Sequence, residues 1–125
     1  MGIIKEKIIL KGVLGSYETR AMFDSGATFS FIRKDIAEKL DLITKFPNPR
    51  TFNTAKGGQS IEITERITLD FELENEVLWD EFLVTDQLNQ DVIIGARTMQ
   101  VWHLKLDFEN DKVIVDHEAA TLLLI

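Results

Sequence analysis

The 125-residue chain contains no cysteine, so disulfide bonds, a thiol nucleophile and cysteine-ligated zinc are excluded. It has only two histidines, His103 and His117, which lack the spacing of a metal-ligand pair, so we expect no metal site. Lysine and arginine number 14 against 21 acidic residues, and this net charge of −7 argues against a nucleic-acid or membrane partner. No apolar run approaches the roughly 18 residues of a membrane span. These absences favour a cytoplasmic protein. A chain of 125 residues is long enough for one domain and too short for two, so a single domain over residues 1–125 is expected.

Short apolar segments separated by turn residues run along the chain and predict strands. Residues 3–14 and 17–23 predict a hairpin with its turn at Gly15-Ser16. Apolar residues at odd positions over 61–73 predict a long strand with one buried face. The unbroken apolar run over residues 92–95 is typical of a strand buried on both faces. The pattern as a whole predicts an all-β, barrel-like fold.

One or two short helices are expected among these strands. Apolar residues recur at helical spacing between residues 32 and 40, and Ser30 is a candidate N-cap for that helix. A second short helix is predicted over residues 96–103. Pro47 and Pro49 end any helix and predict a loop.

The most informative stretch is Asp24-Ser25-Gly26-Ala27, which follows the apolar residues 21–23 at the end of a predicted strand. Burying an unpaired carboxylate costs several kcal/mol or drives its protonation, so an acid at this position is unusual. Gly26 permits a tight turn, including a left-handed one, and the turn amides can point at the carboxylate. Such a junction suits an acid that performs chemistry.

This tetrapeptide resembles the Asp-Thr/Ser-Gly-Ala signature of aspartic proteases, specifically the single-lobe retropepsin-like family. That family also has an apolar-apolar-Gly motif downstream, which packs beneath the catalytic turn and begins a helix, and Ile93-Ile94-Gly95 matches it. The glycine-rich segment between the two motifs lies where the family places its substrate-covering flap. On this resemblance the flap and substrate-binding residues are Phe52, Ala55, Lys56, Gly57, Gly58 and Gln59.

The resemblance implies an aspartic endopeptidase in which two carboxylates share one proton and activate a water. The chain has one Asp-Ser-Gly, so a symmetric homodimer would supply the second acid by bringing Asp24 against its own copy. Ser25 would hydrogen-bond across the axis, and the support residues are Ser25, Gly26, Ala27, Ile93, Ile94 and Gly95. The implied partners are a second copy and a polypeptide substrate, and no cofactor is implied.

Some positions depart from the family pattern. Ala96 directly follows the downstream glycine, where members often carry Arg, and Arg97 comes next. Thr28 and Phe29 stand where retroviral enzymes carry acids. The sequence therefore resembles the cellular or microbial branch more than the viral one. The apolar residues 120–125 fit either a strand at the dimer interface or part of the monomer's own core.

Two other readings are compatible with these residues. The first is a non-catalytic dimerisation or peptide-binding module of the same fold, and the second is a monomeric barrel with Asp24 in an ordinary turn. A calcium loop is rejected, because Lys112 occupies the position of its required glycine in the acidic stretch 107–118. A serine hydrolase is also rejected, because no G-x-S-x-G sequence surrounds Ser25.

Overall fold

The computed structural model describes residues 2–53 and 59–118. The described chain is mostly strand, with two short helices, as the sequence predicts. The elements in chain order are β1 (Ile3–Gly12), β2 (Gly15–Asp24), β3 (Ser30–Arg33), α1 (Lys34–Ala37), β4 (Thr44–Asn53), β5 (Ser60–Leu73), β6 (Glu76–Thr85), β7 (Val92–Gly95), α2 (Ala96–Val101), β8 (Lys105–Asp107) and β9 (Lys112–Ile114).

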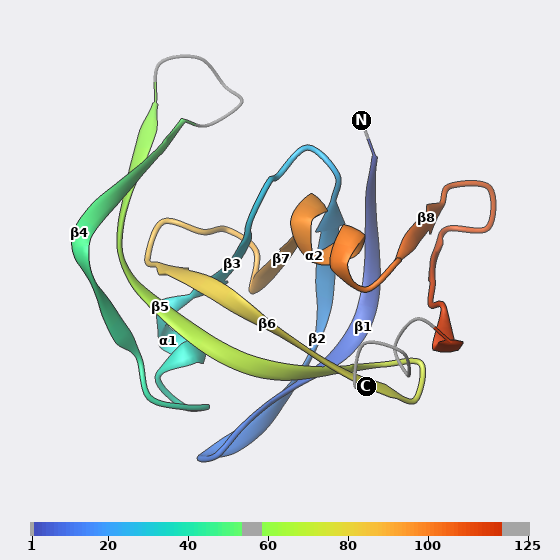
Figure 1. The fold of residues 1–125 in the computed structure, drawn as a ribbon, viewed down its shortest axis with the longest axis horizontal. Coiled ribbons are helices and arrows are strands. Elements are labelled where there is room, and N and C mark those ends of the chain that lie inside the picture. Colours follow the sequence, from blue (N-terminus) through green and yellow to red (C-terminus); the bar gives the residue numbers. More distant parts are fainter. Residues whose placement is uncertain (1, 54–58, 119–125) are drawn as a thin grey trace.

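Six strands close into a barrel in the order β1-β2-β7-β3-β6-β5, and the pairing of β1 with β5 completes the ring. Strand β4 pairs only with β5 and lies outside the barrel as an edge strand, so β4 and β5 form a long curved hairpin at one side of the molecule (Figure 1). Two pairings are parallel, β2 with β7 and β3 with β6. Strands β8 and β9 form a separate small hairpin.

The barrel interior is filled by the alternating apolar side chains that the sequence pattern predicts. In β5 the inward positions are almost completely buried, including Ile63, Ile67 and Phe71. Phe71 packs edge-to-face on Phe82 of β6, with ring centroids 6.4 Å apart. Burial of these side chains accounts for the predicted period-two pattern and sets the register of the barrel.

The first hairpin turns earlier than its glycine pattern predicts. Gly12 pairs with Gly15, so Val13 and Leu14 form the turn and the prediction of a turn at Gly15-Ser16 is wrong. The Leu14 amide donates to the Leu40 carbonyl at 2.9 Å, which holds the turn against the segment after α1. A tertiary contact therefore decides where the chain reverses.

Ser30 does not cap a helix. It begins β3, whose four residues lie between β6 and β7, and α1 is confined to Lys34–Ala37 with Arg33 at its N-cap position. Pairing with strands on both sides overrides the helical spacing of the apolar residues. Pro47 and Pro49 also depart from expectation, since they lie within β4, where the register shifts between Lys45 and Arg50. An edge strand tolerates proline at such an irregularity because the missing amide leaves no ladder bond unmade.

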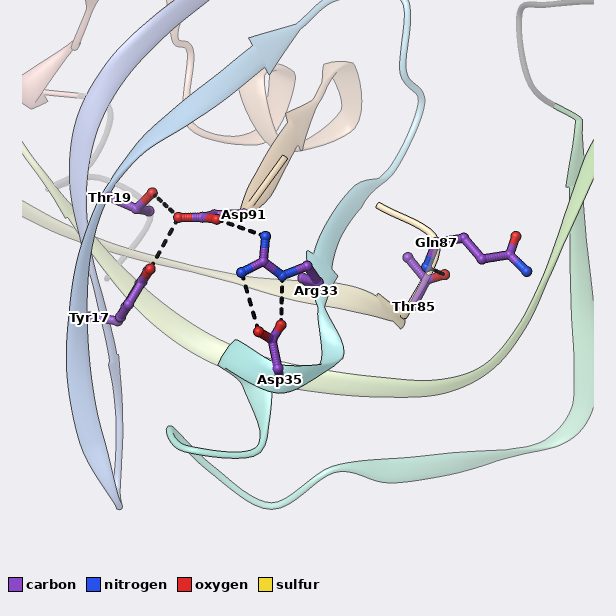
Figure 2. A network of polar contacts seen from close by, with 7 residues as sticks. All are labelled: Tyr17, Thr19, Arg33, Asp35, Thr85, Gln87 and Asp91. Carbon is purple, nitrogen blue, oxygen red and sulfur yellow. Dashed lines mark hydrogen bonds and ion pairs between the residues drawn. The ribbon is translucent and has the colours of Figure 1, made fainter. Parts of the chain in front are cut away.

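A polar network joins β2, β3 and the start of β7 (Figure 2). Asp91, just before β7, accepts hydrogen bonds from the hydroxyls of Tyr17 at 3.2 Å and Thr19 at 2.8 Å, both on β2. The same carboxylate forms an ion pair with Arg33 of β3 at 3.1 Å, and Arg33 also pairs with Asp35 of α1. The network fixes β2, β3 and the start of β7 relative to one another.

The glycine-rich tip of the predicted flap and the apolar tail over residues 120–125 lie outside the described residues. No helix of the described chain has the length and hydropathy needed to traverse a lipid bilayer.

Candidate active site

Asp24 is the last residue of β2 and lies between two neighbouring strands. Its Cα partners are Ile3 on β1 and Gly95 on β7. The preceding Phe23 is completely buried, whereas Ser25 is exposed. The strand therefore carries the half-buried Asp24 side chain to the point where the barrel core meets the surface.

The turn after Asp24 is built from its own amides. The Gly26 amide donates to the Asp24 carboxylate at 2.8 Å, and the Ala27 amide donates to the Asp24 carbonyl at 3.1 Å. The Gly26 backbone is not left-handed. A Cβ at this position would lie 3.2 Å from Oδ1 of Asp24, which is a tight contact. Glycine is suited to this position because it lets the amide approach the carboxylate closely.

Ser25 anchors the turn to the start of the chain. Its amide donates to the Gly2 carbonyl at 3.1 Å, and the Gly2 amide donates to Ser25 Oγ at 3.3 Å. The predicted hydrogen bond of Ser25 across a dimer axis stays a prediction.

The two predicted motifs lie side by side. Ile93, Ile94 and Gly95 run parallel to β2 in register with Met22, Phe23 and Asp24, and α2 begins immediately after Gly95.

The loop after Asp24 is also bonded to the start of α2. The Ala96 amide donates to the Ala27 carbonyl at 2.7 Å, and the Arg97 amide donates to the Thr28 carbonyl at 3.1 Å. A Cβ on Gly95 would lie 2.4 Å from the Phe29 carbonyl oxygen, so only glycine allows the loop to pack this closely.

The β4–β5 hairpin approaches this loop through one aromatic side chain. The Phe52 ring lies 5.6 Å from the Phe29 ring and 5.7 Å from the Phe31 ring, edge-to-face in both pairs. Gln59 is exposed and directly precedes β5. The other predicted flap residues, Ala55, Lys56, Gly57 and Gly58, lie outside the described residues.

Sequence reasoning missed Asp80, a carboxylate close to these loops. Asp80 lies on β6 between the buried residues Leu78 and Phe82, at an inward-facing position. Burial raises the pKa of the Asp80 carboxyl, and the nearby hydroxyls of Ser30 and Thr98 partly offset that rise. The signal was present in the sequence, because an acid occupies a position where strand alternation predicts an apolar residue.

Two cavities flank the site. One of about 320 Å³ is lined by Asp80 together with Phe29, Arg97 and both tryptophans. The other, of about 500 Å³, is an open and largely apolar groove beside Ser25, whose lining includes Met99, Leu104, Leu106 and Phe108. Over residues 2–53 and 59–118, no three His, Asp or Glu side chains gather in a way that would hold a metal ion.

Comparison with known proteins agrees with this geometry. A family model described as aspartyl protease matches residues 10–98, a range that contains both motifs. The chain belongs to the aspartyl protease family. A search of curated proteins gave no significant match.

Solved structures share the fold at low sequence identity. The retroviral protease-like domain of Ddi1 from Leishmania major is similar with a TM-score of 0.66 and 20% identity, over 93% of this chain and 90% of that one. The EIAV protease, solved with the inhibitor HBY-793, gives a TM-score of 0.53 and 15% identity, over 86% of this chain and 94% of that one. The fold is therefore that of the retropepsin-like aspartic proteases.

Proposed function

We propose that residues 1–125 form one protease domain, an aspartic endopeptidase in which Asp24 and Asp24 of a second copy share a homodimer axis. The observation that carries the proposal is the position of Asp24, which ends β2 directly after the buried Phe23, lies beside Gly95 and is held by the Gly26 amide. Membership of the aspartyl protease family supports it.

The chemistry follows from two carboxylates that lie close together and cannot both ionise, so they hold one proton between them. The ionised carboxylate takes a proton from a bound water, and the oxygen of that water attacks the peptide carbonyl carbon. The protonated carboxyl gives its proton to the carbonyl oxygen. As this tetrahedral adduct collapses, the carboxyl that took the water proton gives it to the amine nitrogen, the C–N bond breaks, and the other carboxylate takes back a proton from a hydroxyl of the adduct. No metal or cofactor enters these steps.

The homodimer is proposed because one chain supplies one Asp-Ser-Gly sequence. The apolar groove beside Ser25 offers a surface for the second copy next to the acid, and the exposed lining residue Phe108 would lose solvent contact there. On this proposal, the dimer is required for activity.

The proposed substrate is a polypeptide held between the Asp24 loop and the β4–β5 hairpin. Phe52 brings the hairpin into contact with Phe29 and Phe31, which are respectively before and within β3. A hairpin that closes over the substrate would exclude water other than the attacking molecule.

The test combines sedimentation velocity with cleavage of an unstructured protein between about pH 4 and pH 7. Wild type, Asp24→Asn and a control, Glu18→Gln, are compared over a concentration series. Glu18 is an exposed acid on the same strand. We expect all three to dimerise, and only Asp24→Asn to lose cleavage.

Other outcomes would decide against the proposal. Cleavage by Asp24→Asn at the wild-type rate would place the chemistry elsewhere. A strict monomer that cleaves would exclude the shared dyad. A dimer without cleavage at any pH would favour a non-catalytic dimerisation or peptide-binding module.

A further inference from the structure

A relay of hydrogen bonds leads from Gly95 to the carboxylate of Asp80. The Gly95 amide donates to Ser30 Oγ at 3.1 Å, and Ser30 Oγ lies 2.9 Å from Thr98 Oγ1. The Thr98 hydroxyl in turn donates to Asp80. The relay joins four elements, β7, β3, α2 and β6, and it starts at the direct neighbour of Asp24.

While Asp80 is ionised, hydrogen-bond chemistry fixes the direction of every bond in the relay. An ionised carboxylate only accepts, so the single Thr98 hydroxyl proton is directed to Asp80. Thr98 Oγ1 must then accept from Ser30, which leaves a lone pair of Ser30 for the Gly95 amide. The other carboxylate oxygen of Asp80 is also occupied, because it accepts the Glu81 amide at 2.8 Å.

The two hydroxyl residues of the relay are buried, whereas Asp80 is partly exposed and lines the cavity of about 320 Å³. Ser30 is 2% exposed and Thr98 is 4% exposed, so a lost partner of either hydroxyl is costly to replace. Among the described residues, no buried side-chain nitrogen or oxygen lacks a hydrogen-bond partner, which agrees with the complete assignment above.

The charge of Asp80 is set by few groups. Burial raises the pKa of its carboxyl, whereas the Ser30 and Thr98 hydroxyls, the Glu81 amide and the Arg97 guanidinium of α2 act in the opposite direction. The other ionisable side chain around the cavity is Glu81 of β6, which pairs with Arg66 of β5 at 3.5 Å. Asp80 is therefore expected to take up a proton at a higher pH than an exposed aspartate does.

Protonation reverses part of the relay. With the Glu81 amide on one carboxyl oxygen, the proton lies on the other and is donated to Thr98 Oγ1, so the Thr98 hydroxyl proton turns to Ser30. We propose that Asp80 is a positioning residue for the Asp24 site, because its ionised carboxylate sets the direction of the relay that ends at the Gly95 amide beside Asp24. This inference rests on the proposed function for the role of Asp24, but not for the existence of the relay.

The relay is tested by nuclear magnetic resonance on the full chain carrying Asp24→Asn, which removes titration of the neighbouring acid. The Asp80 carboxyl carbon and the Gly95 amide are followed from about pH 3 to pH 7. We expect the chemical shifts of the Asp80 carboxyl carbon and of the Gly95 amide to change with an inflection at the same pH. Adding Thr98→Val should abolish the Gly95 inflection and leave the carboxyl of Asp80 titrating, whereas Asp70→Asn, on the exposed face of β5, should change neither.

Activity provides an independent readout. In the protein with Asp24 intact, Thr98→Val should lower kcat about tenfold with little change in KM, since misplacement of reacting groups slows the chemical step. Thr98→Ser keeps the hydroxyl and should retain wild-type kcat. A Gly95 inflection that survives Thr98→Val would overturn the relay, and unchanged kcat in a cleaving enzyme would overturn the positioning role. If wild type cleaves nothing, the proposed function fails, and the amide titration alone decides the relay.

Discussion

Asp24 and Gly95 are Cα partners across two parallel strands, and each is the last residue of its strand. The chain after Asp24 turns back over Gly95, and the chain after Gly95 enters α2. The acid and the glycine therefore depend on each other's position, and small changes at Gly95 should reach Asp24.

Gly95→Ala should disrupt this contact. The added methyl group would lie 2.4 Å from the Phe29 carbonyl oxygen, which is backbone and cannot rotate away. We expect the free energy of unfolding to fall by about 1–3 kcal/mol and cleavage to fall with it. Urea unfolding measures the first effect. Gly15→Ala is the control, because its methyl group would meet only Lys39 O at 3.4 Å, and a loss as large as that of Gly95→Ala would contradict the prediction.

Asp91→Asn should destabilise the fold more than Asp35→Asn. Asp91 accepts two hydroxyl hydrogen bonds and pairs with Arg33, and its side chain is 29% exposed. Asp35 pairs with the same arginine but is 61% exposed, so solvent weakens its contribution. We expect a loss of about 1–3 kcal/mol for Asp91→Asn and below about 1 kcal/mol for Asp35→Asn by chemical denaturation. Equal losses would show that the network in Figure 2 does not depend on burial.

The contribution of Asp80 to stability should fall as pH rises. Burial places the pKa of the folded carboxyl above the ordinary value of 3.8, so the folded protein holds the proton more tightly than the unfolded chain does. The stabilising effect is complete below that ordinary value and is lost as pH rises through the folded pKa. We therefore expect the unfolding free energy of wild type, minus that of Asp80→Asn, to decrease from acidic to neutral pH. The difference between wild type and Asp70→Asn should lack this decrease, and a rise for Asp80 would contradict the prediction.

Phe52→Ala should impair substrate cleavage more than Phe46→Ala. Phe52 makes two edge-to-face contacts with rings beside the Asp24 loop, whereas Phe46, on the same strand, packs under Arg50 and Arg66. Loss of two aromatic contacts, each worth about 0.5–1.5 kcal/mol, should lower kcat/KM about tenfold if they close the hairpin over the substrate. Steady-state cleavage of one peptide by both variants measures the effect. Similar values for the two variants would show that Phe52 has no special role.

Local patterns in the sequence predicted the elements that carry the site. The apolar residues 21–23 located Asp24 at the end of a strand, the apolar run before Gly95 located β7, and alternation located β5. In each case the signal lies within a few neighbouring residues. The β-rich barrel class followed from the same patterns and is confirmed by the structure and by the related folds.

Features that depend on distant contacts could not be predicted in this way. The spacing of the apolar residues after Ser30 predicts that it caps a helix. In the structure β6 and β7 pair with β3 from both sides, so Ser30 is a strand residue. Pro47 and Pro49 predict a loop because proline breaks regular elements. In the structure they lie in a strand, and the edge position of β4 accommodates them. The role of Asp80 likewise requires Thr98 and Ser30, which approach it only in the folded barrel.

The bonds between Ser30 and its partners have a consequence for the timing of synthesis. Ser30 bonds to Gly95 and Thr98, which follow it by 65 and 68 residues in the chain. A nascent chain emerges from the ribosome N-terminal end first, so Asp24 leaves long before the strand that must lie beside it. Under the proposed function, the growing polypeptide carries its acid without a finished site until Gly95 and Thr98 have emerged, and until then it is prevented from cutting itself or its neighbours.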